Sequence, residues 1–215
     1  IDPVTPPEGL KASLRDYQLQ GFQWMQFLAR HGLHGILADD MGLGKTLQTI
    51  THILAEKKSG HSRGLPTLVV APTSVVPNWR AEVLKFAPEL RVLVLNGPER
   101  KKYFRSIPHA DIVLTSFALL QRDIEKLRGF SYHLMVMDEA QNIKNPRSKV
   151  AQAACKVVVF EAGSAQAEGA AARVAAAMLA PLAESAVAPA PLVRMGHYGL
   201  ARWPDWLRAP AHQHI

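Results

Sequence analysis

The stretch that decides the fold is GILADDMGLGKT, which occupies residues 35–46. A short apolar run at residues 35–38 leads into a turn with two glycines, and residues 46–58 have the apolar spacing of a helix. The turn matches the phosphate-binding loop G-x-x-x-x-G-K-[ST], except that Asp39 stands at the first glycine position. Such a loop binds phosphate through converging backbone N–H groups and the positive end of the helix that follows. The sequence therefore predicts a strand, a phosphate loop and a helix.

Two side chains at the end of this loop have expected roles in binding Mg²⁺-ATP. Lys45 is predicted to reach the β- and γ-phosphates, and Thr46 to ligate Mg²⁺. The residues expected to surround the phosphates are Asp40, Met41, Gly42, Leu43 and Gly44. A glycine-rich turn with an incidental lysine is the alternative, and the strand before the turn and the helix after it favour the phosphate loop.

The same alternation of apolar strand and helix recurs along the first two thirds of the chain. An amphipathic helix is predicted over residues 14–29. Further apolar runs occupy residues 67–71, 91–95, 111–115 and 134–137, with helical segments between them. Continuous apolar strands joined by crossover helices predict an α/β fold with a mostly parallel sheet, helices on both of its faces, and ligands at the carboxyl ends of the strands.

The last of these apolar runs ends in two adjacent carboxylates. Asp138 is predicted to hold Mg²⁺ through its water shell, and Glu139 to orient or deprotonate the attacking water. By itself such a pair is more often an exposed turn. Its position downstream of a phosphate loop, within one α/β domain, favours a catalytic role.

The chain resembles the Swi/Snf-type ATPases of helicase superfamily two. Five motifs occur in that family's order: LRDYQ at residues 14–18, ILADDMGLGKT at 36–46, VAPTS at 70–74, LTSF at 114–117 and DEAQ at 138–141. An aspartate at the first glycine position of the phosphate loop is usual in this family. The resemblance covers about residues 10–156. It implies the first RecA-like lobe of a DNA-translocating ATPase, with ATP and Mg²⁺ as cofactors, double-stranded DNA as partner and a bacterial-style DEAQ box.

The resemblance also implies roles for residues that composition alone would not single out. Gln18 would read the adenine edge, and Gln141 would couple the nucleotide site to a second lobe. Contacts to DNA phosphates would come from small residues on two loops, namely Pro72, Thr73, Ser74, Thr115 and Ser116. By their chemistry alone, these five residues would be interpreted as turn or helix-capping residues.

Other polar and aromatic residues are interpreted as solvated helix faces. One set is Trp79, Arg80 and Lys85, and the other is Lys101, Lys102 and Arg105. The basic surplus belongs to residues 1–156, which hold 21 Lys and Arg against 14 Asp and Glu, whereas the rest of the chain holds 4 of each. A surplus of this size is compatible with DNA binding but does not establish it. The single cysteine, Cys155, excludes an internal disulfide and favours a reducing, cytoplasmic location, which would be nucleoid-associated in a bacterium. Because no run of about 18 apolar residues occurs, no membrane partner is expected.

The composition changes after Lys156. Residues 157–215 contain 17 alanines among 59 residues, with no lysine and clustered prolines. We therefore divide the chain into an extended entry segment at 1–13, an ATP-binding lobe at 14–156 and an Ala/Pro-rich tail at 157–215. The tail stands where the family has motif III and a second RecA-like lobe carrying a catalytic arginine. A truncated lobe followed by a shifted reading frame is expected, and the alternative function is an inactive nucleotide-binding remnant or regulatory fragment.

Overall fold

A computed structural model describes residues 4–37, 39, 42–139, 149 and 151–154 of the chain. Its helices are α1 (Asp16–Arg30), α2 (Lys45–Lys58), α3 (Val76–Phe86) and α4 (Phe117–Leu127), together with the 3₁₀ helix η1 (Pro98–His109). Its strands are β1 (Thr67–Ala71), β2 (Val92–Val94), β3 (Ile112–Ser116) and β4 (Leu134–Met137). The predicted alternation of strands and helices is confirmed across these elements.

The four described strands form one parallel sheet in the order β2-β3-β1-β4. Thr67, at the start of β1, pairs with Ile112 on one side and with Leu134 on the other. The two inner strands, β1 and β3, are buried along their whole length, whereas β2 and β4 are half-buried. This burial explains why the inner strands read as uninterrupted apolar runs.

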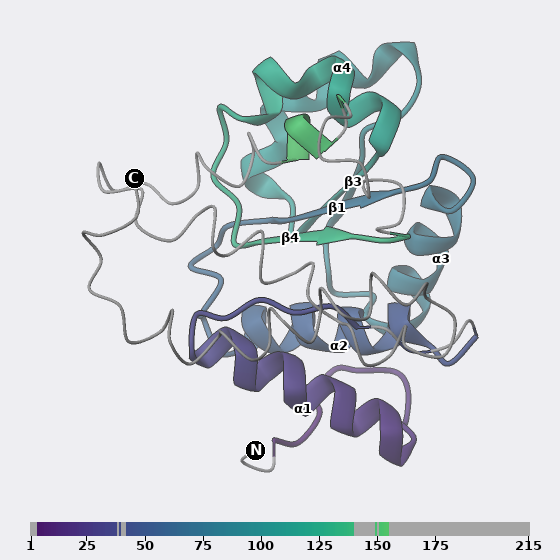
Figure 1. The fold of residues 1–215 in the computed structure, drawn as a ribbon, viewed down its shortest axis with the longest axis vertical. Helices are drawn as coiled ribbons and strands as arrows, with labels where there is room; N and C mark the ends of the chain where they lie inside the picture. The colour runs from purple at the N-terminus through teal and green to yellow at the C-terminus, as the bar shows by residue number, and fades with distance from the viewer. Residues whose placement is uncertain (1–3, 38, 40–41, 140–148, 150, 155–215) are drawn as a thin grey trace, which may run out of the picture.

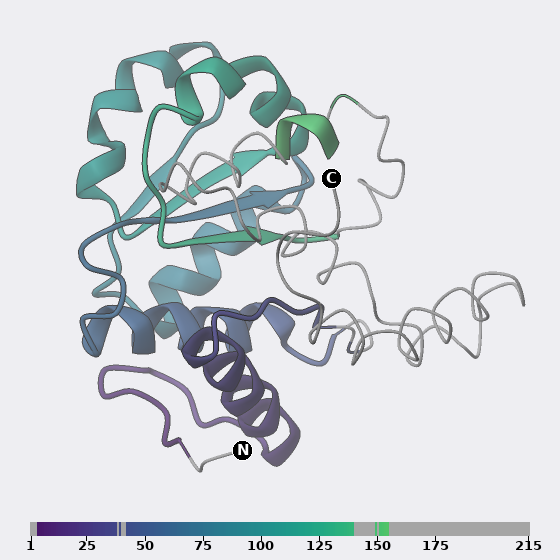
Figure 2. The ribbon, with the colours of Figure 1, turned by 60° about the vertical axis from the view of Figure 1, so that its left-hand side comes forward.

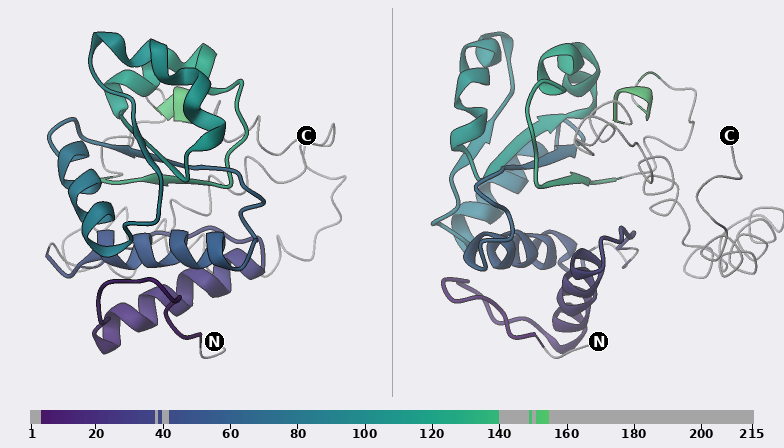
Figure 3. Two further views of the ribbon diagram at one scale, coloured as in Figure 1. Left: turned by 180° about the vertical axis from the view of Figure 1, so that it is seen from behind. Right: turned by 90° about the vertical axis from the view of Figure 1, so that its left-hand side faces the viewer.

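Helices cover both faces of the sheet, as predicted (Figure 1). Side chains alternate between the two faces along a strand, so that Val69 of β1 faces α2 and α3 while Leu68 and Val70 face η1 and α4. α1 lies outside this sandwich, against the outer side of α2 (Figures 2 and 3). The first helix of the chain is thus held by the helix that follows the phosphate loop rather than by the sheet.

The prediction of a fifth strand at residues 35–38 is wrong for the part that the structure describes. Residues 35–37 form an irregular segment, and among the described residues they pair with no strand. Gly35 lies directly against the side chains of Trp24 and Leu28 on α1. The segment therefore packs along α1, and this competing contact is the physical reason for the difference. Ala38 lies outside the described residues.

A buried polar network joins α1 to α2. The Gln26 amide nitrogen lies 2.8 Å from His52 Nδ1 and donates to Glu56 Oε1 at 3.2 Å. His133 Nε2, just before β4, lies 2.9 Å from Glu56 Oε2. Burial lowers the pKa of His52 to about 4, although the negative charge of Glu56 opposes the change. The network thus holds a neutral histidine in the interior.

The free energy of unfolding is expected to fall in acid because of His52. The unfolded histidine takes up a proton near pH 6.5, whereas the folded one stays neutral until about pH 4. Stability that is present above pH 6.5 is therefore lost as the pH falls toward 4, by about 2 kcal/mol between pH 7 and pH 5. Urea unfolding at the two pH values measures this loss.

His52→Gln should reduce that loss, because the amide keeps an acceptor for Gln26 but has no proton to gain. His109→Gln, at an exposed position on η1, is the matched control and should behave like the wild type. An unchanged pH dependence in His52→Gln would contradict the assignment.

The tail at 157–215 and the end of the predicted lobe at 156 lie outside the described residues, so these boundaries and the shifted reading frame stay predictions. Within the described part of the chain, no helix is both long and apolar enough to cross a membrane.

Candidate nucleotide-binding site

The glycines of the predicted phosphate loop have positive φ angles. Gly42 and Gly44 have φ angles of 85° and 79°, in the left-handed region that favours glycine. Apart from its chain neighbours, no atom of the described residues lies within 4 Å of a Cβ atom added at Gly42, so these residues leave the loop open there. No side chain of the described residues caps α2, whose first turn follows directly at Lys45. The backbone donors of that turn and the open loop fit a phosphate group.

Lys45 and Asp39 lie together within the loop. Lys45 Nζ donates to the Asp39 carbonyl oxygen at 2.6 Å, and Asp39 Oδ2 accepts a hydrogen bond from Gln48 Nε2 at 2.9 Å. The aspartate that replaces the first glycine of the loop is therefore tied to α2 by its side chain. The Asp39 carbonyl oxygen holds the Lys45 ammonium group beside the loop. A bound phosphate would replace this carbonyl as the hydrogen-bond acceptor.

Gln48 of α2 also lies directly against α1 at Gly21. Its side chain is fully buried, and its Oε1 atom has no hydrogen-bond partner among the described residues. A Cβ atom added at Gly21 of α1 would lie 1.9 Å from this oxygen. Because Gly21 has no side chain, the Gln48 amide can occupy the space beside it.

Gln18 connects α1 to the phosphate loop. Its Oε1 accepts a hydrogen bond from the Arg15 backbone N–H at 3.0 Å, which caps the start of α1. Its Nε2 donates to the Leu43 carbonyl oxygen at 3.0 Å. The structure thus brings Gln18 to the loop, and its contact with adenine stays a prediction.

Gly44→Ala is expected to lower the affinity for nucleotide in addition to straining the backbone of the loop. An alanine at position 44 would have to adopt the left-handed φ of Gly44, at a cost of about 1–2 kcal/mol. Its Cβ atom would also lie 2.6 Å from Gln18 Nε2. Gly60→Ala is the matched control, because it has a φ of 75° but no atom within 4 Å of the added Cβ. Both variants should lose stability in thermal unfolding, and only Gly44→Ala should lose affinity for a fluorescent ATP analogue. Equal nucleotide affinity in the two variants would refute the role of this contact.

Asp138 and Glu139 lie at the carboxyl end of β4. Asp138 N donates to the Val70 carbonyl oxygen of β1 at 2.9 Å, and Asp138 Oδ1 accepts from Glu139 N at 2.9 Å. Glu139 has a φ of 54°, which is uncommon for a residue with a side chain. β4 ends on the side of the molecule where α2 begins, on the right in Figure 1 and on the left in the rear view of Figure 3. The end of β4, with its two carboxylates, and the start of α2 therefore lie on the same side of the molecule.

The interpretation of Trp79 as part of a solvated helix face is wrong. Its side chain is only 2% exposed and packs in the core between α3 and the sheet. Its indole Nε1 donates to Asp138 Oδ2 at 2.8 Å. The spacing of Trp79 and Val83, one helical turn apart on α3, was the signal that could have placed it on the buried face. Arg80 and Lys85 are exposed as expected, as are Lys101, Lys102 and Arg105 on η1.

Glu82 of α3 is an acidic group that interacts with Asp138. Burial raises the pKa of Glu82, and the negative charge of Asp138 raises it as well, although Lys85 opposes the change. The charge of Glu82 thus interacts with that of Asp138.

The five residues predicted to contact DNA fall into two groups. Thr73 and Ser74 are exposed in the loop between β1 and α3, and Pro72 beside them is half-buried. Thr115 and Ser116 are buried, the first donating to the Leu95 carbonyl oxygen at 3.4 Å and the second accepting from Leu119 N at 3.4 Å as the N-cap of α4. The capping role considered for this group is thus confirmed for Ser116, and DNA contact by any of the five stays a prediction.

Thr46 lies in the first turn of α2 and is half-buried, consistent with its predicted place beside the phosphates. Asp40, Met41 and Gln141 lie outside the described residues, so their predicted roles are unchanged. Among the described residues, no cluster of three or more His, Cys, Asp or Glu side chains forms a metal site. The Mg²⁺ predicted here would instead be held by one carboxylate, one hydroxyl and the nucleotide.

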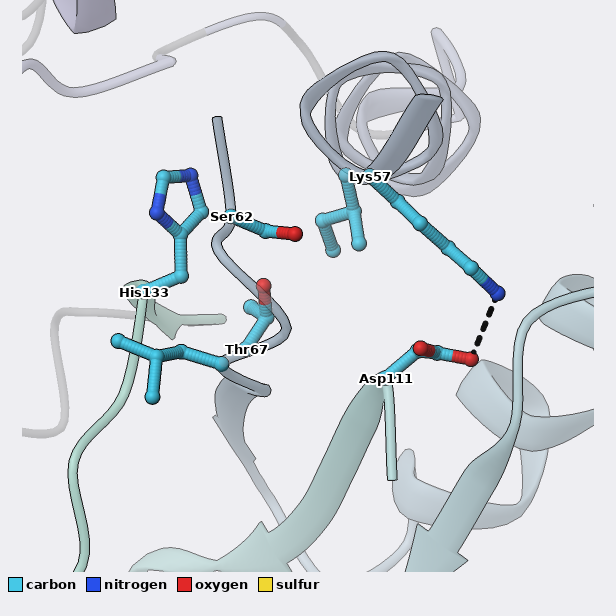
Figure 4. Close-up of a pocket in the computed structure, with 7 residues that line it drawn as sticks. Lys57, Ser62, Thr67, Asp111 and His133 are labelled. Atoms are coloured by element: carbon cyan, nitrogen blue, oxygen red, sulfur yellow. Dashed lines mark hydrogen bonds and ion pairs between the residues drawn. The ribbon is translucent and has the colours of Figure 1, made fainter. Parts of the chain in front are cut away.

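A small hollow lies at the opposite edge of the sheet. Figure 4 shows Lys57, Ser62, Thr67, Asp111 and His133 around it, with Lys57 Nζ 2.9 Å from Asp111 Oδ2. Thr67 begins β1, Asp111 directly precedes β3 and His133 directly precedes β4. Burial acts to raise the pKa of Asp111, but hydrogen bonds from Arg91 and Lys57 outweigh it and lower that pKa. Because ligands of parallel α/β sheets bind at the carboxyl ends of the strands, this hollow is not the nucleotide site.

A family model described as the SNF2-related domain matches residues 17–160, which is more than half of the chain. The chain belongs to the SNF2-related family. YwqA of Bacillus subtilis is 44% identical over 150 residues, which are 68% of this chain and 16% of YwqA. The TATA-binding protein-associated factor MOT1 of Saccharomyces cerevisiae is 40% identical over 163 residues, which are 70% of this chain and 9% of MOT1.

The solved SWI2/SNF2 ATPase core of Sulfolobus solfataricus, in complex with double-stranded DNA, is similar in both sequence and fold. It is 43% identical, with a TM-score of 0.68 over 73% of this chain and 32% of that core. The RecA-like, helicase-type ATPase fold of this SNF2-related chain is thereby established. The chain spans less than a third of the solved core and less than a fifth of the curated relatives named above.

Proposed function

We propose that this chain is the Mg²⁺-ATP-binding lobe of a DNA-dependent, Swi/Snf-type translocase. The observation that supports the proposal is that three motifs lie on the same side of the molecule. Gln18 contacts the phosphate loop at Leu43, Lys45 lies beside Asp39, and Asp138 ends the strand on the same side of the molecule. Lys45 would bind the β- and γ-phosphates, and Thr46 and Asp138 would hold Mg²⁺. When bound, the ion would neutralise charge that develops on the transferred phosphoryl group.

Double-stranded DNA is the second ligand that we propose. Support comes from the Sulfolobus core, which was solved with double-stranded DNA and is 43% identical. Thr73 and Ser74 are exposed and follow the carboxyl end of the inner strand β1. Hydroxyl and backbone N–H groups of this kind bind phosphate oxygens without reading the base sequence.

Affinity for duplex DNA is expected to fall steeply with salt and to be the same for unrelated sequences. Each cationic side chain that neutralises a phosphate contributes a slope of about −0.9, so contacts from two of the lobe's basic side chains, beside the hydroxyl contacts, would weaken binding about 10-fold between 50 and 200 mM salt. Fluorescence anisotropy of labelled duplexes measures both effects. The double substitution Thr73→Ala with Ser74→Ala should weaken binding further.

Ser106→Ala removes an exposed hydroxyl from η1, on the other face of the sheet, and is the matched control that should bind DNA normally. A DNA affinity that does not change with salt concentration would refute contacts between cationic side chains and phosphates. Equal affinity of the double variant and the wild type would refute a role for the loop that contains Thr73 and Ser74. Nucleotide binding without any DNA binding would instead favour the nucleotide-binding remnant as the function.

A further inference from the structure

The hydrogen bond between Trp79 and Asp138 joins the core of the lobe to its predicted metal site. The Trp79 ring packs with Val76 and Val83 of α3 against the sheet, and its N–H needs an acceptor because it is buried. That acceptor is Oδ2 of Asp138, at 2.8 Å. A neutral indole N–H bonded to a carboxylate is a charge-assisted hydrogen bond, which is stronger than one between neutral groups.

The remaining contacts of Asp138 leave its carboxylate little freedom. Its backbone N–H is bonded to Val70 of β1, its Oδ1 accepts from Glu139 N, and its Oδ2 accepts from Trp79. Both oxygens therefore have a fixed direction. An ionised carboxylate offers about four acceptor positions, so each oxygen keeps one for a water of the Mg²⁺ shell.

The helix that carries Trp79 begins in the loop predicted to contact DNA. The Pro72 carbonyl oxygen accepts from Val75 N at 2.9 Å and from Val76 N at 3.3 Å, and Trp79 N in turn donates to the Val75 carbonyl oxygen. The chain from Pro72 to Trp79 is therefore one hydrogen-bonded unit. The donor to Asp138 is therefore connected through the first turn of α3 to the loop that precedes this helix.

We propose that Trp79 is a positioning residue, which orients the Asp138 carboxylate for Mg²⁺ and ties it to the loop that starts at Pro72. The inference rests on the proposed function, since it assigns Mg²⁺ to Asp138. Its physical basis is that a ligand held by an outer hydrogen bond loses less freedom when the metal binds. Loss of such an outer partner typically weakens a metal site about 10- to 100-fold.

Trp79→Phe tests the inference, because it keeps an aromatic ring in the core and removes only the N–H donor. The measurement is the affinity for a fluorescent ATP analogue as Mg²⁺ is titrated, starting from EDTA. We expect the variant to need about 10- to 100-fold more Mg²⁺ than the wild type, with the same affinity for the Mg²⁺-free nucleotide. A residue with a packing role alone would not shift the Mg²⁺ dependence.

Val83→Ala is the matched control, because Val83 is fully buried on the same face of α3 and has no polar side-chain atom. It should lower the unfolding temperature and leave the Mg²⁺ dependence unchanged. An unshifted Mg²⁺ dependence in Trp79→Phe would overturn the inference while leaving the proposed function intact. A wild-type chain that binds nucleotide without any Mg²⁺ dependence would overturn both.

The wild-type chain offers an independent measurement if the Phe variant unfolds. After labelling with 5-fluorotryptophan, one ¹⁹F resonance should shift when Mg²⁺ is added to the nucleotide-bound protein, and Asp138→Asn should abolish that shift. Four tryptophans are present, and Trp24→Phe and changes at Trp203 and Trp206 assign the other three. Absence of any such shift in the wild type would overturn the inference.

Discussion

A two-lobed protein, in which a family-type second lobe replaces residues 157–215, is expected to hydrolyse ATP in the presence of duplex DNA about 10³- to 10⁵-fold faster than the 215-residue chain. The resemblance implies that the nucleotide lies between two lobes and that an arginine of the second lobe neutralises charge on the γ-phosphate. The chain covers 32% of the solved Sulfolobus core. The expected difference corresponds to about 4–7 kcal/mol of activation free energy. Lobe closure around ATP, which translocation requires, also needs both lobes.

Steady-state phosphate release with and without duplex DNA measures this difference. The same fusion with Lys45→Ala is the control, and its turnover should stay at the level of the 215-residue chain. Strong DNA-stimulated turnover by the unmodified chain would contradict the prediction, because another part of the chain or a second copy would then have to supply the arginine.

Lys45→Ala is expected to weaken Mg²⁺-ATP binding about 10- to 150-fold. A hydrogen bond to a charged group contributes about 1.5–3 kcal/mol, and the substitution removes the ammonium group that would bind the phosphates. The structure holds this group beside the loop by its bond to the Asp39 carbonyl oxygen. The fold should persist, since Lys45 is half-buried at the first residue of α2. Titration of a fluorescent ATP analogue measures the affinity.

Lys58→Ala is the matched control for the loss of a positive charge from α2. Lys58 lies at the other end of the helix, where its exposed side chain pairs with Glu89 at 2.9 Å. This variant should bind Mg²⁺-ATP like the wild type, because its charge is remote from the loop. Equal affinities in Lys45→Ala and the wild type would remove the assignment of residues 39–46 as a phosphate loop.

The four described strands could be predicted from sequence because each contains at least three consecutive apolar residues. Their predicted bounds agree with the structure to within one residue at each end. The run at residues 35–38 looks the same in sequence. Whether such a run joins a sheet depends on the partners available to it, and here Gly35 packs against Trp24 and Leu28 of α1. Contacts between residues distant in sequence cannot be read from periodicity.

The candidate site shows the same division between local and distant information. The loop glycines, Lys45 and Asp138 follow from motif spacing, because their chemistry depends on neighbours in the chain. The hydrogen bond from Trp79 to Asp138 joins α3 to the end of β4. Nothing in the sequence of either segment indicates that these two residues are in contact. Likewise, the hydroxyls of Thr115 and Ser116 could not be distinguished from exposed ones before the burial of β3 and the cap of α4 were known.

The contact between Gly21 and Gln48 predicts how this lobe can evolve. A methyl group at position 21 would overlap the Gln48 amide oxygen, and the nitrogen of that same amide holds Asp39 in the phosphate loop. A larger residue at 21 therefore requires a shorter one at 48, and a shorter residue at 48 gives up its bond to Asp39. Relatives that keep an aspartate at the first loop position should have covarying residues at these two sites, with glycine wherever the amide is retained. Ancestral substitutions at position 21 should be permitted only after a change at position 48.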